Sequence, residues 1–513
     1  MTQIKRSSGI LMPMSSLPSP YGIGTMGKAA YDFVDFLAAA GQSYWQILPL
    51  GPTSYGDSPY ASPSSFAGNP YYIDLDMLIK QKLLKKTDVT KYSWGSDPAA
   101  ADYGAIYESR FKVLRKAFEN GREKLAEEIA AFRAENASWL ENYALFMAVK
   151  SSFGMRPWTE WDDGIRRREP EAVARYTEEL KNDIDFWVFT QYLFFDQWTA
   201  LRAYAAEKGI GFIGDVPIYV AMDSADVWSE PQFFQLDEDY RPKEVSGVPP
   251  DDFNEDGQLW GNPLYDYDAM RADGFGWWIR RIGGVSKLYD VIRIDHFRGF
   301  ESYWAVPAGD TTAKNGRWRR GPGMDLVGVL TGWFWNISFI AEDLGYATPQ
   351  VKKLLADSGL PGMKVLMFGF DSHRDSVYLP HNVGENSSMY IGTHDNDTVH
   401  GWLETFLTPE DKKFAAKYMH ITDDEGWCFG MIRTGMASAS RLFVMQMQDV
   451  LELPGSCRMN TPGIPMGNWR WRMLPKSATK KLASKLRDMT AVYRRLPEDS
   501  ELEGQEESFE VED

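Results

Sequence analysis

Eight short apolar segments, separated by helical patterns, place the strongest constraint on how this chain can fold. Runs of this length, ended by glycine or polar residues, are typical of strands buried in a parallel sheet. Parallel strands need long crossover connections, which the intervening helical segments supply. Eight strands that alternate with helices predict a (β/α)8 TIM barrel with long βα loops. The segments lie near residues 10, 45, 212, 292, 338, 365, 390 and 444.

A doubly wound open sheet is the alternative arrangement of alternating strands and helices. That fold would favour a phosphate-binding Gly-x-Gly-x-x-Gly turn after an early strand. In the proline-rich loop that holds Gly22, Gly24 and Gly27, Gly22-Ile-Gly24 is the nearest match, but we interpret its third glycine as coming too early for such a turn. The closed barrel is therefore the preferred prediction.

A long helical segment interrupts the pattern between the second and third strands. Residues 101–153 are rich in strong helix formers, and residues 187–208 carry an apolar stripe. We predict that residues 76–208 form a mainly helical insertion within one catalytic domain that spans residues 1–497. Residues 498–513 contain nine acidic and no basic side chains, which predicts a solvated, disordered tail.

Residues 246–263 form a long predicted loop near the strand ends. Their prolines and glycines argue against regular structure, yet they include the apolar side chains Val248, Phe253 and Trp260. A long loop inside a compact domain is usually a lid or a binding loop. We therefore predict an active-site flap, against the alternative of a passive connection.

The charge balance and the cysteine count exclude some classes of partner. The chain has 72 acidic and 55 basic residues, a net charge of −17, which disfavours nucleic acid and anionic membranes as ligands. Cys428 and Cys457, the two cysteines, are too few for a disulfide framework or a zinc site, so we expect no metal. No apolar run approaches the length of a membrane span, and the start does not resemble a signal sequence. We expect a cytoplasmic protein.

Three carboxyl side chains follow predicted strands directly: Asp295, Glu342 and Asp395. Barrel active sites form at these strand ends, and retaining glycoside cleavage needs one carboxylate nucleophile and one protonated carboxyl. Arg293 shares a strand face with Asp295, which predicts an ionised Asp295. The apolar residues before Glu342 predict a raised pKa and an acid role. Each carboxyl alone could be structural, but three on one rim favour catalysis.

Two further side chains are candidates for sugar contacts. Tyr60 lies in a Gly-, Pro- and Ser-rich loop after the second strand, where an aromatic ring could stack on a sugar; the alternative is a tyrosine that packs the turn. His394 precedes Asp395, and the pair could hold sugar hydroxyls.

Together these segments resemble glycoside hydrolase family 77, the 4-α-glucanotransferases called amylomaltases or disproportionating enzymes, within the α-amylase clan. Arg293-Ile-Asp295 is similar to the nucleophile strand of the clan, the segment around Glu342 to its acid/base strand, and His394-Asp395 to its third acid. The matching segments are residues 56–60, 214–219, 247–263, 293–299, 341–345, 392–396 and 462–471.

The resemblance implies a role for each matched residue. Asp295 would be the nucleophile, Glu342 the acid/base and Asp395 the stabiliser of the transition state. The implied substrate contacts are Tyr60, Asp215, Phe253, Trp260, Arg293, His296, His394 and Asn468, although no specific contact can be assigned to Asn468 or its neighbour Trp469.

The resemblance also implies what accompanies the barrel. The family uses no metal or other cofactor and lacks the C-terminal β-sandwich domain of amylases. The expected partners are α-1,4-glucans and maltooligosaccharides, with the protein a monomer or a weak homodimer.

Three functions remain open from the sequence. An α-1,4-glucan transferase, and an α-glucan hydrolase or branching-type enzyme with the same chemistry, would use the same three carboxylates. The flap with Phe253 and Trp260 favours transfer, because a closed apolar cleft can hold an acceptor sugar and exclude water. A non-catalytic sugar-binding protein is the third possibility, and the intact carboxylate trio argues against it.

Overall fold

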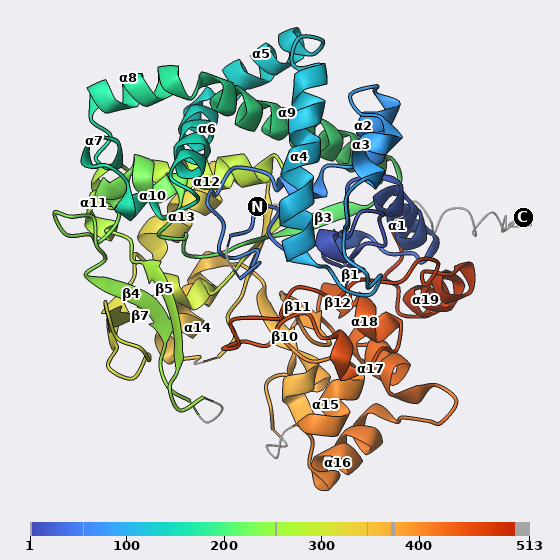
Figure 1. Ribbon diagram of the computed structural model, residues 1–513. Helices are drawn as coiled ribbons and strands as arrows, with labels where there is room; N and C mark the ends of the chain where they lie inside the picture. Colours follow the sequence, from blue (N-terminus) through green and yellow to red (C-terminus); the bar gives the residue numbers. More distant parts are fainter. Residues whose placement is uncertain (1–2, 55, 252–253, 346, 371–374, 498–513) are drawn as a thin grey trace, which may run out of the picture.

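The predicted barrel is confirmed. The computed structural model describes residues 3–54, 56–251, 254–345, 347–370 and 375–497, and eight parallel strands close into a barrel in the order β1-β12-β11-β10-β9-β6-β3-β2 (Figure 1). All eight predicted segments contain one of these strands. They are β1 (Ser7–Leu11), β2 (Tyr44–Gln46), β3 (Gly211–Val216), β6 (Val291–Ile294), β9 (Ser338–Ala341), β10 (Gly362–Val365), β11 (Ser387–Tyr390) and β12 (Leu442–Gln446).

The strand register brings polar residues from neighbouring strands together at one end of the barrel. Asp215 on β3 lies opposite Arg293 on β6, and Ile294 on β6 lies opposite Ala341 on β9. Every residue of β6 and β9 is buried, as expected of strands covered on both faces. The residues that follow these strands therefore leave the core side by side.

Short turns set the ends of two elements near the site. β10 ends at Val365, and the 3-10 turn η6 (Leu366–Phe370) follows it. The helices α11 (Tyr267–Ala272) and α12 (Gly276–Ser286) are separated by a turn at residues 273–275.

Helices fill the connection between β2 and β3. They lie together at the top of Figure 1, and the longest, α9, packs against α4, α5 and α6 and also against α1 and β3. One hydrophobic cluster runs from the barrel into these helices. They are α2 (Leu75–Lys80), α3 (Lys86–Thr90), α4 (Tyr103–Gly121), α5 (Ala126–Glu135), α6 (Ala137–Ser152), α7 (Asp163–Arg166), α8 (Pro170–Glu179) and α9 (Lys181–Glu207).

The prediction that residues 246–263 lack regular structure is wrong. Their two ends form β4 (Glu244–Val248) and β5 (Gln258–Pro263), an antiparallel pair in a separate four-stranded sheet with β7 (Ser302–Pro307) and β8 (Arg317–Arg320). Gly257 and Gly261 adopt the left-handed backbone, with φ of 66° and 77°, so glycine here forms the turn and the bulge of a hairpin. Phe253 lies outside the described residues.

The glycines at 22, 24 and 27 do have the spacing of a phosphate-binding turn, and they precede α1 (Lys28–Ala39). Other parts of the chain pack tightly against two of these glycines. A β-carbon built on Gly24 would lie 1.8 Å from the Met14 carbonyl oxygen, and one built on Gly27 would lie 2.0 Å from Asp74 Oδ2. These glycines therefore allow close packing of the loop, which leaves no room there for a phosphate.

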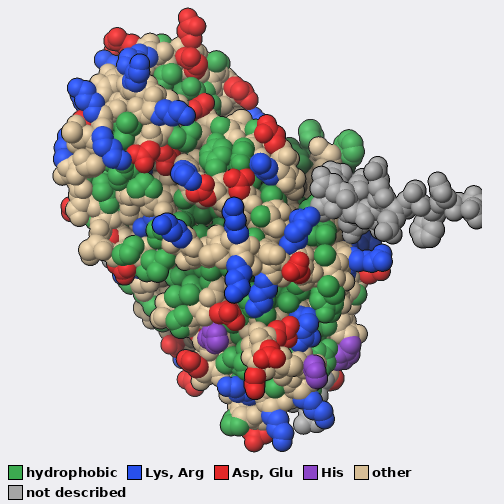
Figure 2. Space-filling model, turned by 90° about the vertical axis from the view of Figure 1, so that its right-hand side faces the viewer, with side chains coloured by type: hydrophobic (Ala, Val, Ile, Leu, Met, Phe, Trp, Pro, Cys, Tyr) green, Lys and Arg blue, Asp and Glu red, His purple; other side chains and the backbone are tan. Residues whose placement is uncertain are grey.

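The remaining helices lie in the connections after β3 and in the chain beyond the last barrel strand. Beyond β12 the described chain forms α18 (Met447–Val450), the 3-10 turn η8 (Gly455–Cys457) and α19 (Lys480–Val492), which packs on α1. Within the described ranges, no helix is long and apolar enough to cross a membrane. On the face in Figure 2, acidic and basic side chains are interspersed. The other named helices include α10 (Ala225–Ser229), α13 (Met324–Trp333), α14 (Pro349–Ser358), α15 (Val399–Thr405), α16 (Pro409–Met419) and α17 (Gly426–Met436).

Candidate active site

A buried arginine joins two carboxylates at the C-terminal ends of β3 and β6. Arg293 Nη1 donates to both carboxylate oxygens of Asp215, each at 2.7 Å, and to Asp295 Oδ1 at 3.0 Å. The side chains of Arg293 and Asp215 are almost completely buried, while that of Asp295 is partly open. The guanidinium charge is therefore shared between two acids.

Glu342 lies beside Asp295 because their strands are neighbours. Its Oε2 accepts a hydrogen bond from the backbone N–H of His296 at 2.8 Å, and its Oε1 accepts one from the N–H of Leu344 at 2.7 Å. His296, directly after Asp295, has a left-handed backbone with φ of 49°. This conformation ends β6 and turns the His296 amide toward Glu342.

The pKa values of both carboxyl groups are raised. Burial raises the pKa of Asp295 to about 8, against the effect of Arg293, and the charges of Asp215, Glu342 and Asp395 add to the rise. The prediction that Arg293 keeps Asp295 ionised is thus wrong in direction, because burial outweighs the attraction of Arg293. Burial raises the pKa of Glu342, as the sequence predicts.

Asp395 is positioned by the chain that follows the last barrel strand. Asn460 Nδ2 donates to Asp395 Oδ1 at 2.6 Å, and Arg458 donates to the Asp395 carbonyl. His394 Nε2 lies 3.4 Å from Asp395 Oδ2. The Asp395 side chain remains 42% exposed, so it can contact a ligand in the cleft.

Tyr60 is part of the same polar network. Its hydroxyl donates to Asp215 Oδ2 at 2.8 Å and lies 2.9 Å from His394 Nε2. The rings of Tyr60 and His394 are stacked at 5.3 Å between centroids, and Trp469 lies within 6.0 Å of both. Burial lowers the pKa of His394, so the imidazole is neutral, and the network assigns its proton to Nε2.

Trp260 reaches the site from the four-stranded sheet. Its ring meets the His296 ring edge to face, with 4.8 Å between centroids, and it is 37% exposed. Burial, together with the positive charge of Arg298, lowers the pKa of His296 to about 3. His296 is therefore neutral at physiological pH, and Trp260 presents an open aromatic surface beside it.

Asn468 stabilises a loop at the top of the cleft. Its side chain accepts from the Thr461 N–H at 3.0 Å and donates to the Ile464 carbonyl at 2.7 Å. A β-carbon on Gly463 would lie 3.7 Å from Asn254 Nδ2 of the hairpin, and one on Gly56 would lie 3.6 Å from the Pro465 carbonyl. The loop of residues 461–468 therefore approaches both the hairpin tip and the loop that carries Tyr60.

Arg458 and Asn460 are site residues that the sequence reasoning missed. They precede the matched segment 462–471 by a few residues, and that proximity was the only signal. Phe253 lies outside the described residues, so its predicted contact stays a prediction. Among the residues that the structure describes, no group of three His, Cys, Asp or Glu side chains could hold a metal ion.

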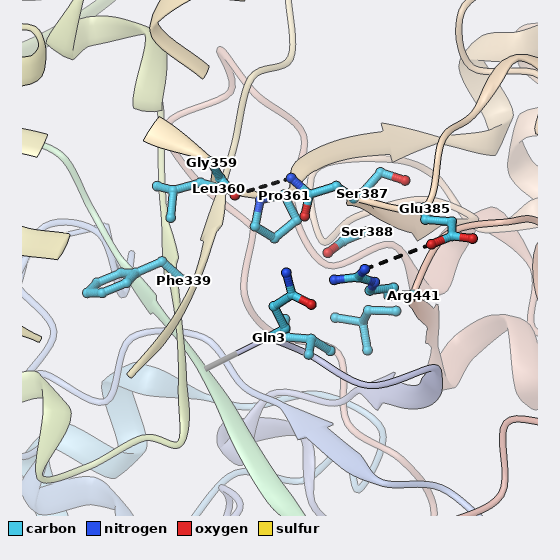
Figure 3. Close-up of a pocket in the computed structure, with 12 residues that line it drawn as sticks. Gln3, Phe339, Gly359, Leu360, Pro361, Glu385, Ser387, Ser388 and Arg441 are labelled. Atoms are coloured by element: carbon cyan, nitrogen blue, oxygen red, sulfur yellow. Dashed lines mark hydrogen bonds and ion pairs between the residues drawn. The ribbon is translucent and has the colours of Figure 1, made fainter. Parts of the chain in front are cut away.

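A small pocket of about 50 Å³ lies at the opposite end of the barrel, where the strands begin. Figure 3 shows Gln3, Phe339, Ser388 and Arg441 around it, with Arg441 3.8 Å from Glu385. It contains none of the predicted site residues, and the N-terminal end of such a barrel generally serves stability.

Known proteins show a consistent likeness to this chain. A family model described as 4-alpha-glucanotransferase matches residues 12–477. The 4-alpha-glucanotransferases of Clostridium butyricum and Thermus thermophilus are 48% and 46% identical, covering 94% and 96% of this chain and 100% of each relative. A structure of amylomaltase from Streptococcus agalactiae in complex with acarbose is 44% identical, with a TM-score of 0.94, over 96% of this chain and 100% of that one. The chain belongs to the 4-alpha-glucanotransferases of glycoside hydrolase family 77.

Proposed function

We propose that this chain transfers segments of α-1,4-glucan to the 4-hydroxyl of an acceptor sugar, with Asp295 as nucleophile and Glu342 as acid/base. The observation that carries the proposal is the pairing of these two carboxyl groups. Ile294 and Ala341 are register partners, so Asp295 and Glu342 follow them on strands about 4.8 Å apart. Retention of configuration needs carboxyl groups about 5–5.5 Å apart, and this placement supports it.

In the first step, a carboxylate oxygen of Asp295 attacks the anomeric carbon. The bond from that carbon to the leaving 4-oxygen breaks, and the proton of Glu342 passes to that oxygen. The product is a glycosyl ester on Asp295 and a shortened glucan. In the second step, an acceptor 4-hydroxyl gives its proton to the Glu342 carboxylate and attacks the same carbon, which releases Asp295.

Proton placement favours these roles. Burial raises the pKa of both carboxyl groups, so the pair holds a proton more readily than two free carboxyl groups would. When the pair carries one negative charge, Arg293 draws that charge to Asp295 by direct donation at 3.0 Å. The backbone donors on Glu342 then stabilise its carboxylate after it has released the proton.

The surrounding groups would bind the sugar at the cleaved end. Asp395, held by Asn460, presents a carboxylate to two sugar hydroxyls and to the positive charge that develops on the ring. Tyr60, Asp215 and His394 form one hydrogen-bonded unit, which fixes polar atoms before the glucan arrives. Such preorganisation is a major source of transition-state stabilisation.

Transfer requires that a sugar outcompete water for the covalent intermediate. Water is present at about 55 M, while oriented groups reach effective molarities of about 10⁵–10⁸ M. The Trp260 ring, beside His296, and the loop of residues 461–468, which approaches the hairpin tip, provide the surfaces that would hold an acceptor.

Products from pure maltotriose test this function. We expect glucose and a ladder of longer maltooligosaccharides, with almost no net gain in reducing ends. If reducing ends rise in step with glucose and maltose, and no longer products form, the protein is a hydrolase and the transfer proposal is wrong.

A further inference from the structure

Two tryptophans stand exposed on the outer surface, shortly before β9 begins. Trp333, at the end of α13, is 66% exposed, and Trp335, two residues later, is 68% exposed. Large exposed aromatic groups are uncommon on a monomer surface and mark interaction sites when they occur together. Neither residue has a part in the catalytic proposal.

The pair is held in place by the residue between them. Phe334 packs against the core, and a β-carbon on Gly283 of α12 would lie 3.7 Å from its ring. The Phe334 N–H donates to the Leu330 carbonyl at 2.9 Å, and the Phe334 carbonyl accepts from the Ile337 N–H at 3.0 Å. Both indoles therefore project from a fixed turn.

The exposed face of the C-terminal half of α13 is open and uncharged. After Asp325, which pairs with Arg271 at 3.2 Å, the exposed positions of α13 carry no charged side chain. Gly328 and Gly332 are exposed, and a β-carbon on either would meet nothing within 4 Å. A ligand could approach the helix backbone closely along this face. α13 packs between α12 and α14 (Figure 1).

We infer that Trp333 and Trp335 form a second binding site for neutral α-glucan chains, separate from the catalytic cleft. The ligand identity rests on the proposed function, since a glucan is the polymer on which that function acts. The apolar faces of glucose rings stack on indoles, and a neutral ligand suits an uncharged surface. The two tryptophans lie before the start of β9, and Glu342 lies just after its end. The length of this strand, about 13 Å, therefore separates the proposed site from the acid/base.

Two other occupants fit this surface less well. Two indole side chains that are each two-thirds exposed present a surface area of about 300 Å². A stable protein interface buries about 800 Å² of surface on each partner. A membrane surface would require Lys or Arg beside the aromatic groups, and the segment of residues 324–336 contains neither. The area and the lack of charge both favour a short stretch of glucan.

Affinity electrophoresis of the full chain in native gels with and without amylopectin tests the site. The variant W333A/W335A should bind amylopectin at least about fivefold more weakly than the wild type. Its kcat/KM on maltotriose should not change, because the cleft is intact. Phe406→Ala, which removes an aromatic side chain that is 55% exposed on another part of the surface, is the matched control and should behave as the wild type.

Three results would overturn the inference. Equal retardation of W333A/W335A and the wild type would mean that the cleft alone binds the polymer. Loss of retardation in Phe406→Ala would mean that the effect is not specific. A change of W333A/W335A from dimer to monomer in sedimentation, with retardation unchanged, would make this face an interface between copies. Failure of the proposed function would appear separately, as altered wild-type products from maltotriose.

Discussion

Arg293 connects the chemistry of the site to its electrostatics. A single guanidinium contacts both Asp215 and Asp295, so its charge is divided between them and burial dominates the pKa of Asp295. A strand pattern shows that Arg293 and Asp295 share a face, but it cannot show that Asp215 from another strand competes for the same arginine. Burial outweighs the effect of this shared arginine, and for that reason the predicted ionisation of Asp295 was wrong.

Replacement of the nucleophile should abolish turnover without loss of the fold. Asp295→Asn removes the attacking oxygen but leaves Arg293 bonded to Asp215. We expect kcat to fall by at least about four orders of magnitude, the scale seen when a catalytic nucleophile is removed, with an unchanged melting transition. Steady-state rates with maltotriose measure this. A variant that keeps more than a tenth of the wild-type rate would exclude Asp295 from the role.

The acid role of Glu342 predicts a dependence on the leaving group. Glu342→Gln keeps an oxygen to accept from one backbone amide but cannot release a proton. We expect a large loss of kcat with maltooligosaccharides, while a glycosyl fluoride, which needs little protonation, still forms the covalent intermediate. Mass spectrometry of the intact protein detects that intermediate. Equal losses with both donors would assign the proton to another group.

At the scale of elements, the hairpin β4–β5 offers a direct test of transfer against hydrolysis. Trp260 and its neighbour Leu259 are each 37% exposed, and the Trp260 ring meets the His296 ring edge to face. We expect Trp260→Ala to raise the hydrolysed share of products severalfold, because the acceptor loses its aromatic surface, and Leu259→Ala to leave that share unchanged. The ratio of new reducing ends to glucose released measures it. The same rise in both variants would point to general loosening of the hairpin.

The elements differ in how well the sequence predicts them. The barrel strands were predictable because nearly every residue in them is buried and each contains apolar side chains. The hairpin was not, because Gly257 and Gly261, which read as signs of a loop, are the residues that form its turn and bulge. Arg458 and Asn460 reach Asp395 from more than sixty positions away, and a single sequence gives no sign of such contacts.

Across the whole molecule, buried carboxyl groups outside the site couple stability to pH. Asp449 in α18 is completely buried, and burial, together with the charge of Asp397, raises its pKa to about 7. In an unfolded chain the value is about 3.9. The folded state therefore holds this proton more tightly, so the stabilising contribution is full below about pH 4 and is lost as pH rises through 7.

Asp449→Asn should remove this dependence. In the wild type, the Val399 N–H donates a hydrogen bond to Asp449 Oδ1 at 2.7 Å. The asparagine amide oxygen can accept the same hydrogen bond, but the side chain can no longer ionise. Wild-type protein loses stability as Asp449 ionises between pH 5 and pH 8, and the variant does not. The Tm of the variant minus the Tm of the wild type should therefore be at least about 2 °C larger at pH 8 than at pH 5, since each pKa unit is worth about 1.4 kcal/mol. Asp424→Asn, at an exposed position, is the control and should give a constant difference. Calorimetric scans at both pH values measure the effect, and a Tm difference for Asp449→Asn that does not vary with pH would show that Asp449 does not ionise in the folded protein over this range.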